Sequence, residues 1–159
     1  INIAPDLPQK EQIVENALQV TRALGNPEPR IAMLAAVETV SPAMKATEDA
    51  ALIAKMAERG QIRGCRIDGP LALDNAVSVI AAKHKGIGGE VAGMADILVV
   101  PFIEVGNVLY KSLVYFAGAP LGGIVIGAAA PVVLTSRADS PENKMNSIAL
   151  AVVVSGANQ

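Results

Sequence analysis

Stretches with helical spacing of apolar residues alternate with short, almost wholly apolar runs. Residues 8–24 show the helical spacing and end at Gly25, whereas the run RIAMLAAV at 30–37 is typical of a buried strand. The same criteria predict helices at 47–59, 71–83, 104–116 and 141–154, and strands at 63–67, 95–100, 122–126 and 132–134. Strands separated by helices predict an α/β fold, three-layer α/β/α, with a mainly parallel sheet. We expect residues 1–159 to form a single α/β domain.

The segment from Ser112 to Ser136 carries no formal charge and is long enough to suggest a membrane span. Pro120, Pro131 and several glycines interrupt it, and its periodicity changes along the way. We therefore predict a helix end followed by buried strands, and no membrane partner.

Composition narrows the classes of function. Hydrophobic residues make up 52% of the chain and charged residues 18%, which predicts a folded globular protein. The net charge of −2 argues against nucleic acid as the main partner. A single cysteine excludes an internal disulfide and fits a reducing, cytoplasmic location, and a single histidine without a Cys/His cluster predicts no metal site.

Polar residues follow several predicted strands. They are Glu38 and Thr39, then Asp68 and Gly69, then Glu104, Gly106 and Asn107, and finally Thr135, Ser136 and Arg137. Because ligands of open α/β sheets bind beyond the carboxyl ends of the strands, we expect these loops to form one site. Each group also has a plainer explanation. Asp68 and Gly69 suit a turn, and Glu104, Asn107 and Lys111 share one helical face that could simply be solvated.

The segment VVLTSRADSPENK, residues 132–144, joins a predicted strand to a predicted helix. Ser140 and Pro141 suit the N-cap and first position of that helix. Its free N–H groups, the Ser136 hydroxyl and the Arg137 guanidinium could surround a phosphate or an acyl phosphate. The alternative is that Arg137 merely pairs with Asp139 or Glu142 at the surface.

Three long segments resemble the C-terminal half of the phosphate acetyl/butyryltransferase family, closest to its butyryl branch. They are DGPLALDNAVS, AGMADILVVPFIEVGNVLYKSLVYFAGA and APVVLTSRADSPENKMNSIALA. The same half occurs in proteins resembling bifunctional enoyl-CoA hydratase/phosphate acyltransferases. The resemblance implies a fold similar to isocitrate and isopropylmalate dehydrogenases. Family members are about twice this length, consistent with two domains. Because the chain also begins at Ile1, we expect it to be the C-terminal part of a longer phosphate acyltransferase.

The family implies reversible transfer of a short acyl group, such as acetyl or butyryl, between coenzyme A and inorganic phosphate. Both are substrates, no cofactor is implied, and a homodimer is expected. By resemblance Ser136 and Arg137 face the acyl phosphate. The acetyl branch has its basic aspartate near the position of Asn143 here, so Glu142 is the nearest acidic candidate, with Asp139 behind it. The predicted substrate-binding residues are Thr135, Asp68, Gly69, Glu104, Gly106, Asn107 and Lys111.

A different class of function also fits the sequence. If the polypeptide starts at Ile1, it lacks the N-terminal half, whose arginines clamp phosphate and coenzyme A in the family, and the site is half built. The alternative is therefore a non-catalytic folding or dimerisation domain.

Overall fold

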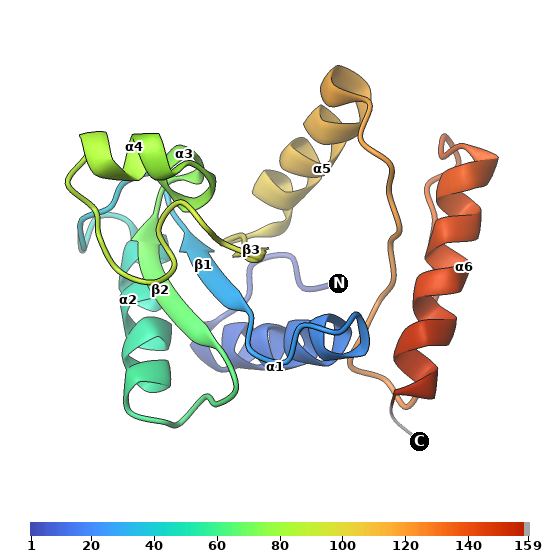
Figure 1. The fold of residues 1–159 in the computed structure, drawn as a ribbon, viewed down its shortest axis with the longest axis horizontal. Coiled ribbons are helices and arrows are strands. Elements are labelled where there is room, and N and C mark those ends of the chain that lie inside the picture. Colours follow the sequence, from blue (N-terminus) through green and yellow to red (C-terminus); the bar gives the residue numbers. More distant parts are fainter. Residues whose placement is uncertain (158–159) are drawn as a thin grey trace.

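A small parallel sheet lies at the centre of the structure, a computed structural model that describes residues 1–157. Strand β1 (Arg30–Leu34) lies between β2 (Arg66–Leu71) and β3 (Ile97–Val99), and both neighbours run parallel to it (Figure 1). An ion pair joins the starts of β1 and β3, because the Arg30 guanidinium donates to both carboxylate oxygens of Asp96 at 2.9 and 3.0 Å. These hydrogen bonds hold the pKa of Asp96 at about 2.

Two long helices cover one face of the sheet. Ile31 and Met33 of β1 point to this face and pack with α1 (Leu7–Ala23) and α2 (Lys45–Glu58). The start of α1 is set by Asp6, whose carboxylate accepts the Gln9 N–H at 2.9 Å in a capping box.

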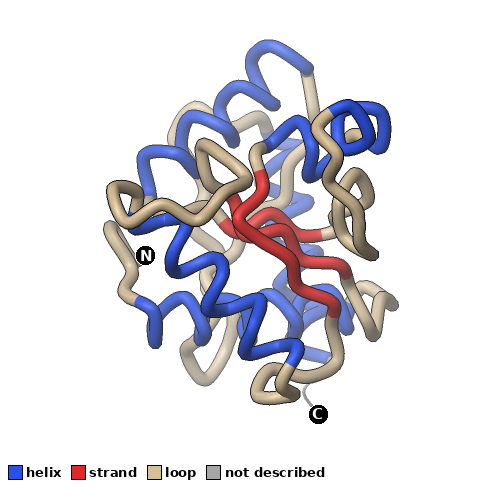
Figure 2. Tube along the Cα trace, turned by 90° about the vertical axis from the view of Figure 1, so that its left-hand side faces the viewer, coloured by secondary structure: helices blue, strands red, loops and turns tan. Residues whose placement is uncertain are grey.

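The opposite face carries two short helices. Ala32 and Leu34 of β1 pack there with Ala76 of α3 (Leu73–Val77) and Ala82 of α4 (Val79–His84). Helices therefore lie on both sides of the sheet, as the tube drawing in Figure 2 shows, and the predicted α/β architecture with a parallel sheet is confirmed.

The predicted boundaries of one helix and one strand were wrong. The helix expected at 71–83 is two helices, because Ser78 is extended (φ −126°) and its hydroxyl caps the second by accepting the Ala81 N–H. The strand expected at 63–67 runs instead from Arg66 to Leu71. Asp68 and Gly69 therefore lie within a strand and not in a loop after it.

The last third of the chain leaves the sheet. Helix α5 (Ile103–Ala117) ends at Gly118 in the left-handed conformation (φ 63°), and an extended segment leads to α6 (Pro141–Gly156), which packs against α1 (Figure 1). The strands predicted at 122–126 and 132–134 were wrong, since only one bridge, between Val125 and Val132, forms there.

Side chains of α6 explain why no strand forms. Asn143 accepts the N–H of Leu121 at 3.0 Å, and Ser147 accepts the N–H of Gly123 at 2.9 Å. Helix side chains thus satisfy two of the backbone donors that a neighbouring strand would have paired. Apolar side chains that were expected to be buried stay accessible, and Leu134 is 65% exposed. Among residues 1–157, no helix has the length and apolarity needed to cross a membrane.

Candidate functional site

A cavity of about 1100 Å³ opens at the carboxyl ends of β1 and β3. Its walls are mainly apolar and include Leu34 after β1, Phe102 after β3, Met44 before α2, and Val105 and Val108 on α5. The N-termini of α1, α2 and α5 all contribute residues to it. The edge of the sheet where the sequence predicted ligand binding therefore does carry a cavity.

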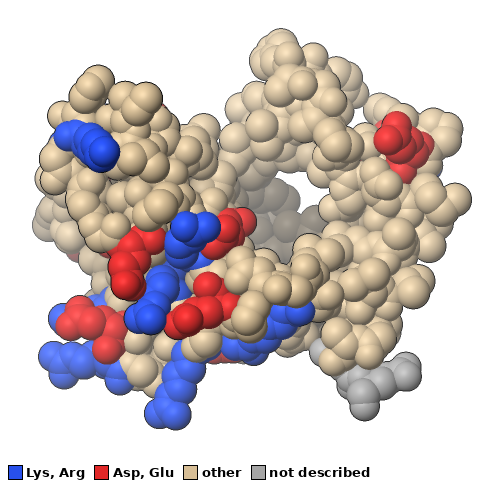
Figure 3. Space-filling view, in the orientation of Figure 1, with Lys and Arg blue, Asp and Glu red and all other residues tan. Residues whose placement is uncertain are grey.

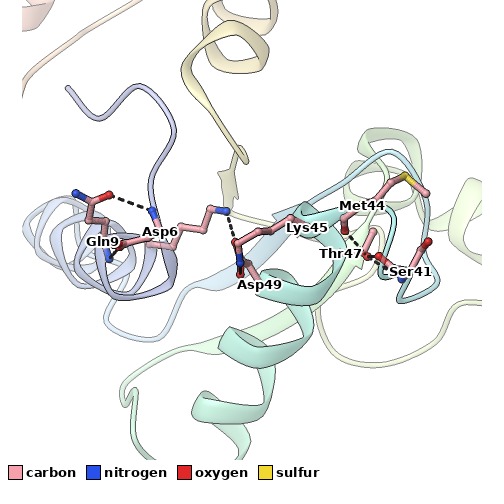
Figure 4. Close-up of polar contacts among 8 residues, drawn as sticks. Asp6, Gln9, Ser41, Met44, Lys45, Thr47 and Asp49 are labelled. Atoms are coloured by element: carbon pink, nitrogen blue, oxygen red, sulfur yellow. Dashed lines mark hydrogen bonds and ion pairs between the residues drawn. The ribbon is translucent and has the colours of Figure 1, made fainter.

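One buried carboxylate shared by two lysines forms the polar part of this cavity. Asp49 of α2 accepts from Lys10 of α1 at 2.7 Å and from Lys45 at 2.7 Å (Figure 4). Lys10 and Asp49 are both buried, whereas the Lys45 side chain is 72% exposed. Burial alone would raise the pKa of Asp49, but the two ammonium groups outweigh it and the pKa lies below its ordinary value.

The loop between β1 and α2 is tied at both ends by side chains. Near α2, the buried Thr47 hydroxyl accepts the Ser41 N–H at 2.8 Å and donates to the Met44 carbonyl at 2.8 Å (Figure 4). Near β1, the Glu38 carboxylate accepts from the side-chain amide of Asn75 and from Lys85 at 2.6 Å. The Lys85 hydrogen bond is the main reason why the pKa of Glu38 lies below its ordinary value.

The Ser-Arg pair lies in a tight turn before α6. One oxygen of the Asp139 carboxylate accepts the Ser136 N–H at 2.6 Å, and the Asp139 N–H donates to the Ser136 carbonyl at 3.1 Å. The other carboxylate oxygen accepts from the Tyr110 hydroxyl of α5 at 2.9 Å. Ser140 then caps α6 by accepting the Asn143 N–H at 3.1 Å, as its sequence position predicted.

Arg137 projects from this turn into solvent. Within residues 1–157 its guanidinium forms no ion pair, and Asp139 is occupied by Tyr110 and Ser136. Glu142, in the first turn of α6, is exposed. The surface pairing of Arg137 with Asp139 or Glu142, which the sequence left open, is therefore not formed, and the guanidinium can accept an anion.

A family model described as "Phosphate acetyl/butaryl transferase" matches residues 1–152. The chain belongs to this family. A "Probable phosphate butyryltransferase" of Bacillus subtilis is 61% identical over 155 residues, covering 98% of this chain and 52% of that relative. A "Phosphate acetyltransferase" of Thermotoga maritima is 51% identical over 151 residues, covering 95% of this chain and 51% of that one.

Solved structures agree with the family. A branched-chain phosphotransacylase from Enterococcus faecalis is 44% identical and superposes with a TM-score of 0.88, over 97% of this chain and 55% of that one. The predicted membership of the phosphate acetyl/butyryltransferase family is thus confirmed, and the higher identity to the butyryltransferase agrees with the predicted branch. The chain spans about half the length of the curated relatives it matches.

In this member of the family, the predicted site residues do not form one cluster. Glu104 lines the cavity, whereas Ser136 and Arg137 lie in the turn that Tyr110 holds. Tyr110 projects from the side of α5 roughly opposite the residues that line the cavity, at about 100° of rotation per residue. Helix α5 therefore separates the cavity from the turn.

Of the predicted polar stripe on α5, only Glu104 lines the cavity, whereas Asn107 and Lys111 do not. Asn107 and Lys111 are exposed, and the Lys111 ammonium lies 5.5 Å from the centre of the Tyr110 ring. Thr135 is half-buried directly before the turn. Thr135 is therefore close to Arg137 in sequence, and Lys111 lies near Tyr110, which bonds the turn.

Two predicted glycines have packing roles that the structure makes explicit. A Cβ on Gly69 would lie 2.7 Å from the Cβ of Met33 and 2.9 Å from its carbonyl oxygen. A Cβ on Gly106 would lie 3.1 Å from the Val100 side chain. Asp68 accepts the Gly69 N–H at 2.8 Å, which is a local bond within β2.

Sequence reasoning missed the residues that reach across the fold. Lys10 pairs with Asp49, 39 positions away, and Tyr110 bonds Asp139, 29 positions away. Lys10 occupies the first turn of a helix that otherwise has charged residues facing solvent, and Tyr110 is one aromatic residue in an apolar helix. Neither position carries a local signal that distinguishes it from an ordinary surface or packing residue.

Proposed function

We propose that the protein containing this chain transfers a short acyl group reversibly between coenzyme A and inorganic phosphate. Acyl-CoA and phosphate give acyl phosphate and coenzyme A. The relatives named as phosphate butyryltransferase and phosphate acetyltransferase support this reaction. The observation that carries it is the Arg137 guanidinium, which has no ion-pair partner among residues 1–157 and lies next to a serine whose N–H is bonded in the turn before α6.

The reaction requires charge stabilisation on phosphate and on the acyl oxygen. In the direction of acyl phosphate formation, a phosphate oxygen attacks the thioester carbonyl, and the C–S bond breaks as the thiolate leaves and takes up a proton. Arg137 would bind phosphate oxygens through its paired N–H donors, and Ser136 would donate toward the oxyanion of the tetrahedral intermediate. Inorganic phosphate and coenzyme A are substrates, and the chemistry needs no further cofactor.

The reverse direction needs a base for the coenzyme A thiol, because a thiol of pKa about 8.5 is mostly protonated at neutral pH. Of the two candidates, Glu142 has an exposed carboxylate, whereas both oxygens of Asp139 accept hydrogen bonds. We assign the base to Glu142. Asn143, at the position where the acetyl branch is expected to have an aspartate, is buried and accepts the Leu121 N–H.

Substrate contacts are assigned to several places. Thr135 directly precedes the turn, and the Lys111 ammonium lies near the Tyr110 ring. Both, together with the exposed Asn107, are proposed to contact phosphate or the coenzyme A thioester. Glu104 lines the apolar cavity on the other side of α5. Gly106 and Gly69 act through close packing, against Val100 and Met33 respectively. Asp68, whose carboxylate accepts the Gly69 N–H, is proposed to contact substrate.

The test is phosphate-dependent thiol release from acetyl-, butyryl- and isobutyryl-CoA by the natural polypeptide that contains this chain. Arg137→Ala should lower kcat/KM by about 10²–10³-fold, the usual loss for one donor to a developing charge. Arg59→Ala is the matched control, since it removes an exposed arginine at the end of α2 and should leave the rate unchanged.

Equal rates for Arg137→Ala and Arg59→Ala would contradict the role of the turn. A folded natural polypeptide without phosphate-dependent release would contradict the transferase proposal and favour the folding or dimerisation alternative. The homodimer and the cytoplasmic location remain predictions, and sedimentation of the purified protein tests the first of them.

A further inference from the structure

A hydrogen bond from the hydroxyl of Tyr110 attaches the turn that carries Ser136 and Arg137 to α5. Tyr110 donates to one oxygen of Asp139 at 2.9 Å, and the other oxygen of Asp139 accepts the Ser136 N–H at 2.6 Å. The carboxylate thus connects a helix on one side to the backbone of the Ser-Arg pair on the other. We call this pair of hydrogen bonds the Tyr110–Asp139 clamp.

From this geometry we infer that Tyr110 and Asp139 are positioning residues that fix the Ser136–Arg137 turn for phosphate binding. The inference rests on the proposed function for its catalytic consequence, but the clamp itself can be tested without it. Neither side chain needs to touch substrate in this role. Asp139 was a candidate base from the sequence, and its two hydrogen bonds assign it to the turn instead.

Local bonds alone would hold the turn only to itself. The Ala138 N–H donates to the Ser136 hydroxyl at 3.3 Å, and the Asp139 N–H donates to the Ser136 carbonyl at 3.1 Å. These bonds close the turn but make no connection to α5. The Tyr110 hydroxyl reaches from 29 positions away and supplies the orientation.

The tyrosine is suited to donate a hydrogen bond here. Its side chain is half-buried. Burial is the main reason why the pKa of Tyr110 lies above its ordinary value, and the hydrogen bond to the Asp139 carboxylate is the second. The hydroxyl therefore stays protonated at neutral pH and donates to the ionised carboxylate, the stronger form of this bond.

Removing the hydroxyl alone tests the clamp. Tyr110→Phe should lower kcat/KM for phosphate by about tenfold, the loss expected when one charge-assisted hydrogen bond that orients a binding group is removed. The KM for acyl-CoA should not change. Tyr115→Phe is the matched control, because it removes the same atom from a residue of the same helix that is 66% exposed.

A double-mutant cycle separates positioning from general stability. If Tyr110 acts through the turn, Tyr110→Phe should cause no further loss in an Arg137→Ala background. Full additivity with Arg137→Ala, together with a lower melting temperature and a higher KM for acyl-CoA, would overturn the inference in favour of a general packing role. A Tyr110→Phe rate equal to that of Tyr115→Phe would also overturn it.

Tryptic cleavage after Arg137 tests the clamp without any activity. A loosened turn should be cut several-fold faster in Tyr110→Phe and Asp139→Asn than in Tyr115→Phe, at equal melting temperatures. Faster cleavage of the Tyr110→Phe and Asp139→Asn variants, in a protein whose wild type shows no transferase activity, would retain the clamp and reject the proposed function. Equal cleavage rates in all three variants would reject the clamp itself.

Discussion

At the scale of the residue, the Asp49 carboxylate is buried and charged, and removing such a group from water costs free energy. The effect of Asp49 on the free energy of unfolding depends on Lys10, which is also buried. Removing one partner of such a pair leaves an uncompensated charge away from water. Lys45 can compensate in part, since it holds the second oxygen from the surface. The pair joins α1 to α2 at the edge of the cavity.

We predict that Lys10→Met lowers the free energy of unfolding by roughly 1–3 kcal/mol, less than a fully isolated buried charge would because Lys45 remains. The double variant Lys10→Met/Asp49→Leu should recover part of this loss. Urea denaturation measures both. Lys55→Met, which breaks the exposed Lys55–Glu58 pair, is the control and should be close to wild type. A double variant less stable than Lys10→Met would contradict the argument.

Residue-scale prediction from sequence succeeded for local chemistry and not for distant partners. The cap at Ser140 depends on neighbours within one helical turn, and the SPE sequence after Ser136 and Arg137 marks the helix start directly. The hydrogen-bond partner of Asp139 is on α5, 29 positions away. From the sequence, Asp139 was predicted to pair with Arg137 or to act as a base, and sequence spacing could not indicate Tyr110.

At the scale of the element, helices were predicted more accurately than strands. Periodicity and caps located α1, α2, α5 and α6 to within a few residues, because both signals are local. The apolar runs at 122–126 and 132–134 matched buried strands in composition, but a strand also needs a partner edge, which composition does not supply. In the structure, α6 side chains take the place of that edge.

Strand β2 provides a prediction at this scale. Gly69→Ala should lower the free energy of unfolding by roughly 1–3 kcal/mol, because the new Cβ would overlap the Met33 side chain and carbonyl of the adjacent strand. Gly88→Ala is the control, since a Cβ there meets nothing within 4 Å. Urea unfolding midpoints compare the two. If Gly69→Ala were as stable as Gly88→Ala but inactive, Gly69 would have the substrate role that the sequence suggested rather than a packing role.

At the scale of the whole molecule, two parts of the chain differ in charge and in packing. The three-layer body consists of the sheet with α1 to α4, and the second part is formed by residues 118–157. In Figure 3 charged side chains gather over the three-layer body, while the part formed by residues 118–157 shows few of them. That part is also apolar at its surface, with Met145, Ile148 and Val152 of α6 between 49% and 66% exposed. The turn with Ser136 and Arg137 lies in it, so the candidate site depends on the less enclosed part of the molecule.

Amide hydrogen exchange of this chain should therefore be uneven. We expect residues 118–140 to exchange fastest, because they contain one isolated bridge and many exposed side chains, and β1 to exchange slowest, because Ile31 to Leu34 are buried between two strands and two helix layers. Mass spectrometry of peptides from the exchanged chain measures both regions. Within the fast region, the peptide that contains Ser136 should be better protected than the one around Gly127, because Asp139 holds its N–H. Equal exchange in 118–140 and β1 would show that the chain opens as one cooperative unit, and a fast Ser136 amide would show that the Asp139 bond does not persist in solution.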